Sequence, residues 1–409
     1  MGISGKYKYI LLELVNKGVP FLMLPLFSHL LTTVEYSELE VMMTMFTFAQ
    51  LFCWFNVNTY YSKVFYSSES YDENRSDLVL LPVLMSILIL IITAALFFIL
   101  KIKQDFYFIL LMISIVIFQF IFQINLIRYQ FTNNFKMFAL LQLSATTINI
   151  IMSYSLVVFD FGAIGRFVGL NSGNSIIGII AFFYWLYFTY NKKYNLDFLD
   201  IKEQFYFGLK LIPFNIMNGW LKDNIAKIIM ITVGVSSGFV GIYGLSFSYS
   251  SAFNVIINAL MVQLTPKIYK NKLNENILKY ELKKHFYLLT VLLFILLPLI
   301  CMSFYYLVDE SYHAGISLIP IFIFSFYFNS ISLVCNVRLL SFNKESKLSY
   351  ISFFYAIIYI SMVFFFVDVM GFSLEFSVAL SYLLGALVQS IISIITVKVC
   401  INEISRNTI

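Results

Sequence analysis

Apolar stretches of about twenty residues recur along the whole sequence, and each is long enough to cross the ~30 Å hydrocarbon core of a bilayer. Hydrophobic residues make up 60% of the 409 residues, and charged residues only 12%. An ordinary soluble domain is roughly 45–50% apolar and 25% charged, so a soluble fold could not bury this much apolar surface. Backbone polar groups in lipid must be satisfied within the chain, which stretches of this length achieve as helices. The sequence therefore predicts an all-α integral membrane protein.

Hydropathy and length together place about twelve transmembrane helices on the sequence. The first six lie near residues 9–31, 38–60, 78–100, 106–127, 137–159 and 171–190. The second six lie near residues 208–231, 239–263, 286–308, 314–337, 349–368 and 376–398. This arrangement predicts an N-terminal six-helix lobe over residues 1–200 and a C-terminal six-helix lobe over residues 201–409, around a central cavity.

Basic residues are concentrated in alternate loops between these helices. One set of loops holds most of the lysines and arginines, whereas the opposite set holds only Lys101, Lys103 and Arg166. The positive-inside rule then predicts that both termini are cytoplasmic. The longest polar stretch, Thr265 to His285, alternates lysines with apolar residues. It fits either a short amphipathic helix on the anionic inner leaflet or an ordinary cytoplasmic loop.

The loop charges give a direct test of this topology. We expect positions Asn74, Gln204 and Asn274 to be cytoplasmic and positions Gln104 and Ser311 to be outside. Single cysteines at these positions, or reporter fusions, would be assayed with a membrane-impermeant label on intact cells. Finding positions 204 and 311 on the same side would contradict the twelve-helix topology.

Short sequence echoes relate the two predicted lobes. Lys17-Gly18-Val19-Pro20-Phe21 in the first helix matches Lys210-Leu211-Ile212-Pro213-Phe214 in the seventh, and Phe161-Gly162 matches Met370-Gly371. An even number of helices separates the two copies, so both begin on the same side of the membrane. The pseudo-two-fold axis that relates the lobes would therefore run along the membrane normal.

Ionisable side chains fall within two helices that this repeat makes equivalent. A charge at mid-bilayer costs about 2.5–3.5 kcal/mol on insertion scales, so each is a candidate for function. Glu13 precedes Lys17 by four residues in the first helix, and Asp223 precedes Lys227 in the seventh, which is the favoured order for a helical ion pair. Lys222 adds another cation. The alternative is that each pair only neutralises itself near a membrane surface, where lysine ammonium groups can reach water.

Candidate substrate-binding residues are these charges together with nearby polar and aromatic residues and a cation at the end of the tenth helix. The predicted set is Glu13, Lys17, Asn218, Trp220, Lys222, Asp223, Lys227 and Arg338. Uncharged polar stripes run along three helices: Gln142, Thr146, Asn149 and Ser153; Ser250, Asn254 and Asn258; and Ser325, Asn329, Ser332 and Asn336. A single stripe is more typical of hydrogen bonding between helices, but together they predict a hydrated, somewhat basic interior.

Motifs for catalysis, nucleotide binding and metal binding are missing from the sequence. It contains no GxxxxGK[ST] or HExxH pattern, and its four cysteines lie far apart. We therefore expect a transporter that is not an enzyme, has no cofactor or metal site and does not bind nucleic acid. An H⁺ or Na⁺ gradient, or the substrate's own gradient, would supply the driving force.

Two stretches of sequence carry a resemblance to a known family. The first runs from Leu14 to Leu31 and continues into Glu35-Tyr36-Ser37. The second runs through Phe207-Gly208, Leu211-Ile212-Pro213, Asn218-Gly219-Trp220, Asp223, Gly234 and Gly241-Ile242-Tyr243-Gly244 to Pro266. In their order and spacing they resemble the Wzx-type polysaccharide-repeat flippases, which share a superfamily with lipid II flippases and with multidrug and toxin extruders. The family often has Arg after the aspartate where this chain has Asn224, so Lys222 or Lys227 would supply that cation.

The resemblance implies a function and a location. Such a flippase moves an undecaprenyl-diphosphate-linked oligosaccharide, an O-antigen or capsule repeat, from the cytoplasmic to the periplasmic leaflet of the bacterial inner membrane by alternating access. Its partners would be this lipid-linked substrate, membrane lipids and other polysaccharide-assembly membrane proteins. Two alternatives stay open: an ion-coupled multidrug extruder of the same architecture, and a repeat-unit polymerase, for which the sequence lacks the expected large periplasmic loop.

Overall fold

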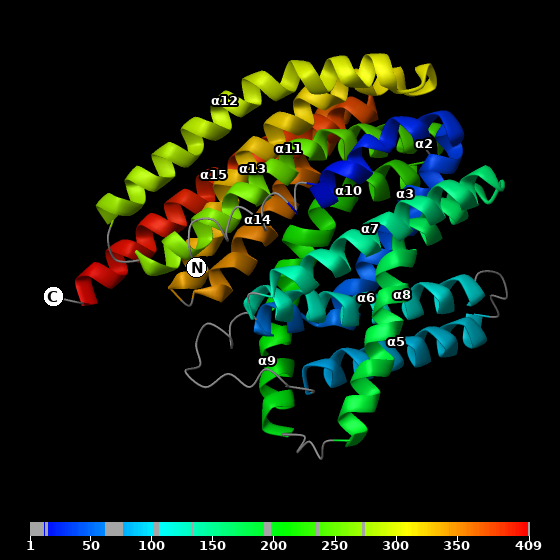
Figure 1. The fold of residues 1–409 in the computed structure, drawn as a ribbon. Coiled ribbons are helices and arrows are strands. Elements are labelled where there is room, and N and C mark those ends of the chain that lie inside the picture. Colours follow the sequence, from blue (N-terminus) through cyan, green and yellow to red (C-terminus); the bar gives the residue numbers. More distant parts are fainter. Residues whose placement is uncertain are drawn as a thin grey trace. The chain divides into compact units, whose positions relative to one another are not determined.

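Helices make up nearly all of the computed structural model, which describes residues 12, 15–61, 77–100, 106–132, 134–191, 198–233, 237–271, 275–342 and 344–407 (Figure 1). No β-strand occurs in that part of the chain. Eight of its helices are long and apolar enough to cross a membrane. The prediction of a polytopic all-α membrane protein is confirmed.

The described residues form two compact units. One consists of Met1–Glu40 with Met217–Ile409, and the other of Val41–Ile216. These units are defined by packing, whereas the division at residue 200 comes from the order of helices along the chain. The two six-helix lobes therefore stay a prediction.

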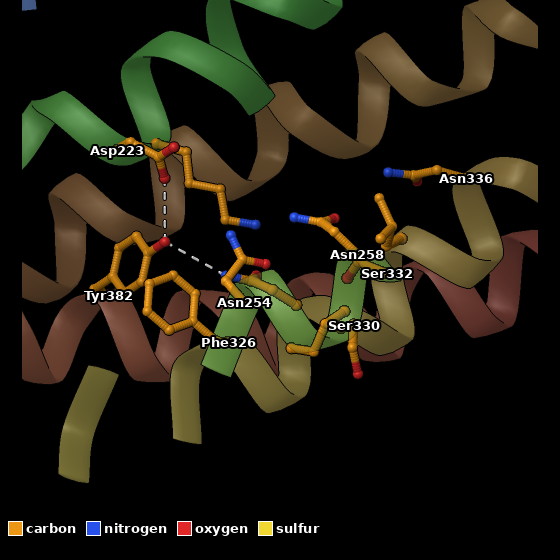
Figure 2. Close-up of a pocket in the computed structure, with 12 residues that line it drawn as sticks. Asp223, Asn254, Asn258, Phe326, Ser330, Ser332, Asn336 and Tyr382 are labelled. Carbon is orange, nitrogen blue, oxygen red and sulfur yellow. Dashed lines mark hydrogen bonds between the residues drawn. The ribbon is translucent and has the colours of Figure 1, made fainter. Parts of the chain in front are cut away.

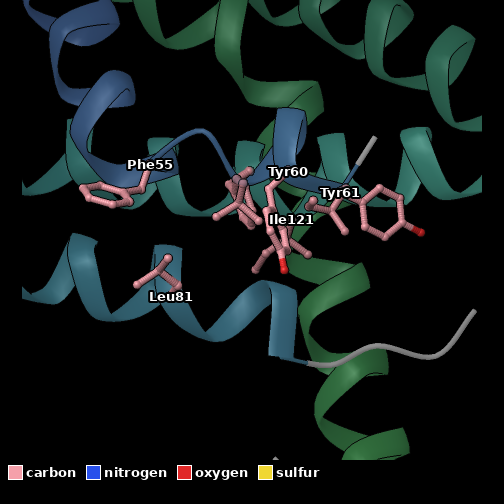
Figure 3. Packing of buried hydrophobic residues seen from close by; sticks show 8 residues of the cluster. Phe55, Tyr60, Tyr61, Leu81 and Ile121 are labelled. Atoms are coloured by element: carbon pink, nitrogen blue, oxygen red, sulfur yellow. The ribbon is translucent and has the colours of Figure 1, made fainter. Parts of the chain in front are cut away.

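The unit of Val41–Ile216 contains most of α3 and five further helices. Their bounds are α3 Thr33–Trp54, α5 Asp77–Leu100, α6 Phe106–Phe131, α7 Phe135–Val158, α8 Gly162–Asn191 and α9 Phe198–Phe214. A cluster of buried residues, with Phe55, Tyr60, Tyr61, Leu81 and Ile121 among its members, forms a core of this unit (Figure 3). This core packs α5 and α6 against the chain that follows α3.

The other unit contains the start of α3 and the second half of the chain. Its elements are α2 Leu24–Leu30, a π-helix η1 Asn215–Leu221 that begins at the boundary, α10 Lys222–Val233, α11 Ser237–Lys270, α12 Glu275–Leu307, the 3-10 helix η2 Glu310–Ser317, α13 Leu318–Ser341, α14 Glu345–Phe364, the π-helix η3 Phe365–Val369 and α15 Leu374–Asn407. Within it α13 packs along both α11 and α15, and α14 packs on α15 (Figure 1).

The predicted helices fall on observed ones, but several of them are interrupted or change helix type along their length. The first, expected to be continuous, is helical over 15–22, turns at Met23 and continues as α2, whose first turn contains Pro25. The second ends at Trp54 because Phe55 and Asn56 adopt positive φ angles of 47° and 60°. The seventh passes from α9 into the π-helix η1 just after Pro213, a residue that lacks the N–H needed for a regular helical bond.

The polar stretch Thr265 to His285 does not form a surface helix of its own. Helix α11 continues to Lys270 and α12 begins at Glu275, so the lysines decorate the ends of two long helices. Lys267 Nζ lies 2.7 Å from Glu281 Oε2 and ties these ends together. The amphipathic-helix alternative is therefore wrong, because the apolar periodicity on each side extends the neighbouring transmembrane helix.

One predicted echo of the repeat has a structural counterpart. Gly162 opens α8 with a φ of 49°, and Gly371, which lies before α15, has a φ of 66°. Positive φ is the region that glycine tolerates and other residues rarely adopt. The two glycines reverse the chain at equivalent places, which supports the proposal that the halves are related.

Helices α7 and α8 approach each other closely along the polar stripe of the fifth predicted helix. The backbone N–H of Gly173 donates to Asn149 Oδ1 at 2.6 Å. A methyl group added to Gly169 would lie 2.3 Å from Ser153 Cα, and one added to Gly173 would lie 2.1 Å from the carbonyl oxygen of Ala145. This stripe therefore joins two helices, as small and polar residues do in membrane interfaces.

We expect Gly173→Ala to lower stability by about 1–3 kcal/mol, the usual effect of overpacking, because backbone atoms of α7 would have to move. Thermal unfolding of the detergent-solubilised protein measures this change. Gly18→Ala is the matched control, since a methyl group there meets nothing within 4 Å. Equal melting temperatures for the two variants would contradict the close approach of α7 and α8.

Candidate functional site

A polar cavity of about 190 Å³ lies among α10, α11, α13 and α15 (Figure 2). Its lining residues are Lys222, Asp223, Asn254, Ile257, Asn258, Phe326, Asn329, Ser330, Ser332, Leu333, Asn336 and Tyr382. Three of these helices, α11, α13 and α15, are long and apolar enough to cross a membrane, where a wall of carboxamide, hydroxyl and charged groups is unusual. The cavity is smaller than the 300–1,000 Å³ typical of sites for drug-sized ligands, so it suits a small polar group or part of a larger molecule.

Lys222 supplies the positive charge among the described lining residues. Its ammonium Nζ donates a 2.6 Å hydrogen bond to Gln389 Oε1 of α15 and lies 4.9 Å from the centre of the Tyr355 ring of α14. A neutral amide oxygen and an aromatic face both stabilise a cation without neutralising it. The charge of Lys222 is thus held in place at the cavity wall.

Asp223, the next residue, supplies the negative charge, and its side chain is exposed at the cavity. The hydroxyl of Tyr382 donates to Asp223 Oδ1 at 3.2 Å. The same hydroxyl accepts a bond from Asn329 Nδ2 at 3.4 Å. Figure 2 shows this chain of contacts, which links α10 to α15 and α13.

The other end of the cavity is uncharged among the described lining residues. Asn336 and Ser332 lie there, and Asn258 of α11 lies beside Ser332, whereas Asn254 lies nearer to Tyr382 (Figure 2). Two buried oxygens on this wall, Asn329 Oδ1 and Ser332 Oγ, have no hydrogen-bond partner in the described part of the chain. Unsatisfied buried acceptors cost about 1–3 kcal/mol each, which water or a ligand hydroxyl would offset. Two of the predicted polar stripes thus meet at one cavity.

The π-helix η1 directly precedes the two charged residues. Seven residues, Asn215–Leu221, have this geometry, and Lys222 begins the following α-helix. A π turn directs its side chains at different angles from an α turn, and such turns are frequent at functional sites. The interruption after Pro213 therefore sets the direction in which Lys222 and Asp223 point.

Lys227 lies on the same helix but has a different partner from the one its sequence spacing suggests. Its Nζ lies 2.6 Å from Glu40 Oε2 of α3, and both side chains are only 9% exposed. The predicted pairing of Asp223 with Lys227 is therefore replaced by a buried ion pair between α10 and α3. Gly244 lies against Glu40, where an added methyl group would come within 2.4 Å of the carboxylate stem.

The remaining predicted site residues lie outside this cavity or outside the described part of the chain. Lys17 is half-buried in the helical segment 15–22, and Glu13 falls outside the described residues. Arg338 lies in the last turn of α13, two residues beyond Asn336, and does not line the cavity.

Two predicted residues belong to η1. Trp220 is half-buried, and its carbonyl oxygen accepts a 2.9 Å bond from Asn224 Nδ2. Asn218 shares the π-helix, but its side chain is outside the described set.

Glu40, Tyr355, Tyr382 and Gln389 were missed in the sequence. Glu40 carried a usable signal, because it is an acid within the second predicted helix and the insertion cost applies to it as it does to Asp223. The two tyrosines carried none, since the chain has 28 tyrosines and their spacing does not single any out.

Comparison with solved structures relates nearly the whole chain to one fold. A crystal structure titled as MATE in complex with MaL6 matches with a TM-score of 0.68 at 12% identity, over 98% of this chain and 96% of that one. The fold is that of the MATE transporters. An outward-facing multidrug resistance MATE family transporter of the MOP superfamily matches with a TM-score of 0.61 at 11% identity, over 98% of this chain and 96% of that one.

An inward-facing MATE family transporter matches with a TM-score of 0.52 at 13% identity, over 99% of this chain and 94% of that one. No protein-family model matches the sequence, and no curated protein sequence does either. The likeness therefore establishes the arrangement of helices, about twelve in the MATE fold as predicted. The substrate is inferred from the residues that line the cavity.

Proposed function

We propose that this protein is a transporter of the bacterial inner membrane that moves a lipid-linked oligosaccharide from the cytoplasmic to the periplasmic leaflet by alternating access. The substrate would be an O-antigen or capsule repeat joined through diphosphate to undecaprenol. The MATE-like fold supports the transport role, and the resemblance of the seventh-helix stretch to Wzx-type flippases supports the substrate.

The observation that carries the proposal is the position of the Lys222 ammonium group and the contacts that it makes. Its ammonium group lines a cavity at membrane depth and is held by an amide oxygen and an aromatic ring. A diphosphate that crosses the hydrocarbon region needs such a cation, since charge-assisted hydrogen bonds offset part of its lost hydration. The undecaprenyl chain needs no cavity because it can stay in the lipid.

An ion-coupled multidrug extruder is the second candidate. The exposed carboxylate of Asp223 favours it, because an acid in a transport cavity attracts cationic drugs and coupling cations. The names of the matched structures point in the same direction. In either case an H⁺ or Na⁺ gradient would drive the cycle. Other polysaccharide-assembly proteins would be partners only of the flippase.

Deletion in the native host, with complementation in a strain that lacks its own flippase, tests these functions. A flippase predicts that the lipid-linked repeat is complete but stranded on the inner leaflet, and that the gene restores surface polysaccharide. An extruder predicts normal polysaccharide and greater sensitivity to cationic dyes. Accumulation of single repeats on the periplasmic face would instead favour a polymerase.

A further inference from the structure

The cavity is divided into two chemically different ends. The ionic end consists of Lys222 and Asp223, and the carboxamide end consists of Asn258, Ser332 and Asn336 (Figure 2). Asn329 lies between them, because its Nδ2 donates to the tyrosine hydroxyl that also bonds Asp223. From Asn329 to Asn336 helix α13 rises about 10 Å, at ~1.5 Å per residue. A group held at the ionic end therefore has its immediate neighbour at the carboxamide end.

We propose that the carboxamide end binds the sugar next to the diphosphate and selects an uncharged sugar, an inference that rests on the proposed function. Carboxamides both donate and accept hydrogen bonds, and so do sugar hydroxyls. Asn258 on α11 lies beside Ser332 on α13, which also supplies Asn336, so a ring at this end meets polar groups from both helices (Figure 2). The unpartnered Asn329 Oδ1 and Ser332 Oγ add acceptors for hydroxyl donors.

The exclusion of acidic sugars follows from the charges around this end. A carboxylate placed among amides without a cation would lose its hydration and gain only hydrogen bonds from neutral donors, which is costly. The nearest cation on α13, Arg338, lies two residues beyond Asn336, and residues two apart on a helix do not face the same side. The lining therefore favours a neutral hexose or N-acetylhexosamine over a uronic acid.

Binding to the full-length protein in nanodiscs of phosphatidylethanolamine and phosphatidylglycerol tests this inference with three probes. These are undecaprenyl diphosphate alone, the same lipid bearing one N-acetylglucosamine, and the same lipid bearing one glucuronic acid. We expect the neutral sugar to tighten binding about tenfold over the bare lipid, the effect of one or two added hydrogen bonds. Glucuronic acid should bind more weakly than N-acetylglucosamine.

The double variant Asn258→Leu, Asn336→Leu should bind the neutral sugar lipid no better than the bare one. Asn271→Leu, the same change at a partly exposed residue just after α11 whose side chain donates to the Lys267 carbonyl, should behave as wild type. Equal binding of bare and sugar-bearing lipids by the wild-type protein overturns the sugar site but leaves the flippase proposal standing. Equal or tighter binding of glucuronic acid overturns the preference for neutral sugars, and failure of all three lipids to bind overturns both proposals.

Discussion

Lys222→Met is expected to lower transport of the lipid-linked oligosaccharide by roughly ten- to hundredfold, because hydrogen bonds to charged groups contribute about 1.5–3 kcal/mol. Methionine keeps most of the length of the side chain and adds no polar group to be buried, so the protein should still insert at its normal level. The amide oxygen of Gln389 and the ring of Tyr355 would then face an apolar chain in place of an ammonium group.

Lys222→Arg should restore part of the activity. Arginine carries the charge and can bind phosphate, but its planar head cannot occupy the compact position that lysine takes beside Gln389. Surface polysaccharide on immunoblots and flipping of a fluorescent lipid diphosphate in liposomes measure the effect. Lys210→Met is the matched control, since Lys210 is exposed on α9. Full transport by Lys222→Met would show that transport does not need the ammonium group of Lys222.

The sequence was sufficient to predict the helices because the bilayer fixes the length and composition of each span. It could not predict the breaks that tertiary packing imposes. Phe55 and Asn56 take left-handed backbone angles where Phe55 packs on Gly208, at which an added methyl group would lie 2.3 Å from the phenylalanine ring. No local pattern marks a phenylalanine for such a conformation, because the surrounding residues read as a continuous helix.

The sequence predicted those residues of the candidate site that are costly to insert into a bilayer. Lys222 and Asp223 stood out as charges in an apolar helix, and the asparagines of α11 and α13 stood out by their helical spacing. Their partners did not, because Tyr382 and Gln389 come from α15, far along the chain. Spacing within one helix suggested Asp223 as the partner of Lys227, whereas packing brought Glu40 to it.

The ion pair of Glu40 with Lys227 leads to the second large effect. Removing one partner of a buried pair leaves an uncompensated charge and typically costs about 3–5 kcal/mol. Lys227→Met and Glu40→Leu should therefore each lower the melting temperature strongly and reduce the amount of folded protein in the membrane. Replacing both partners by apolar residues is often neutral or stabilising, so the double variant should recover most of the lost stability.

Transport by this double variant separates a structural role of Lys227 from a role in substrate binding. If the pair only joins α10 to α3, the double variant transports at a rate close to that of wild type. Adding Asp223→Asn to the double variant then leaves the stability of the protein unchanged. Additive losses of stability in the double variant would mean that each charge has a partner other than the one seen here. A double variant that is stable but does not transport would instead indicate that Lys227 takes part in substrate binding together with Lys222. Loss of packing could not explain the defect in a stable protein.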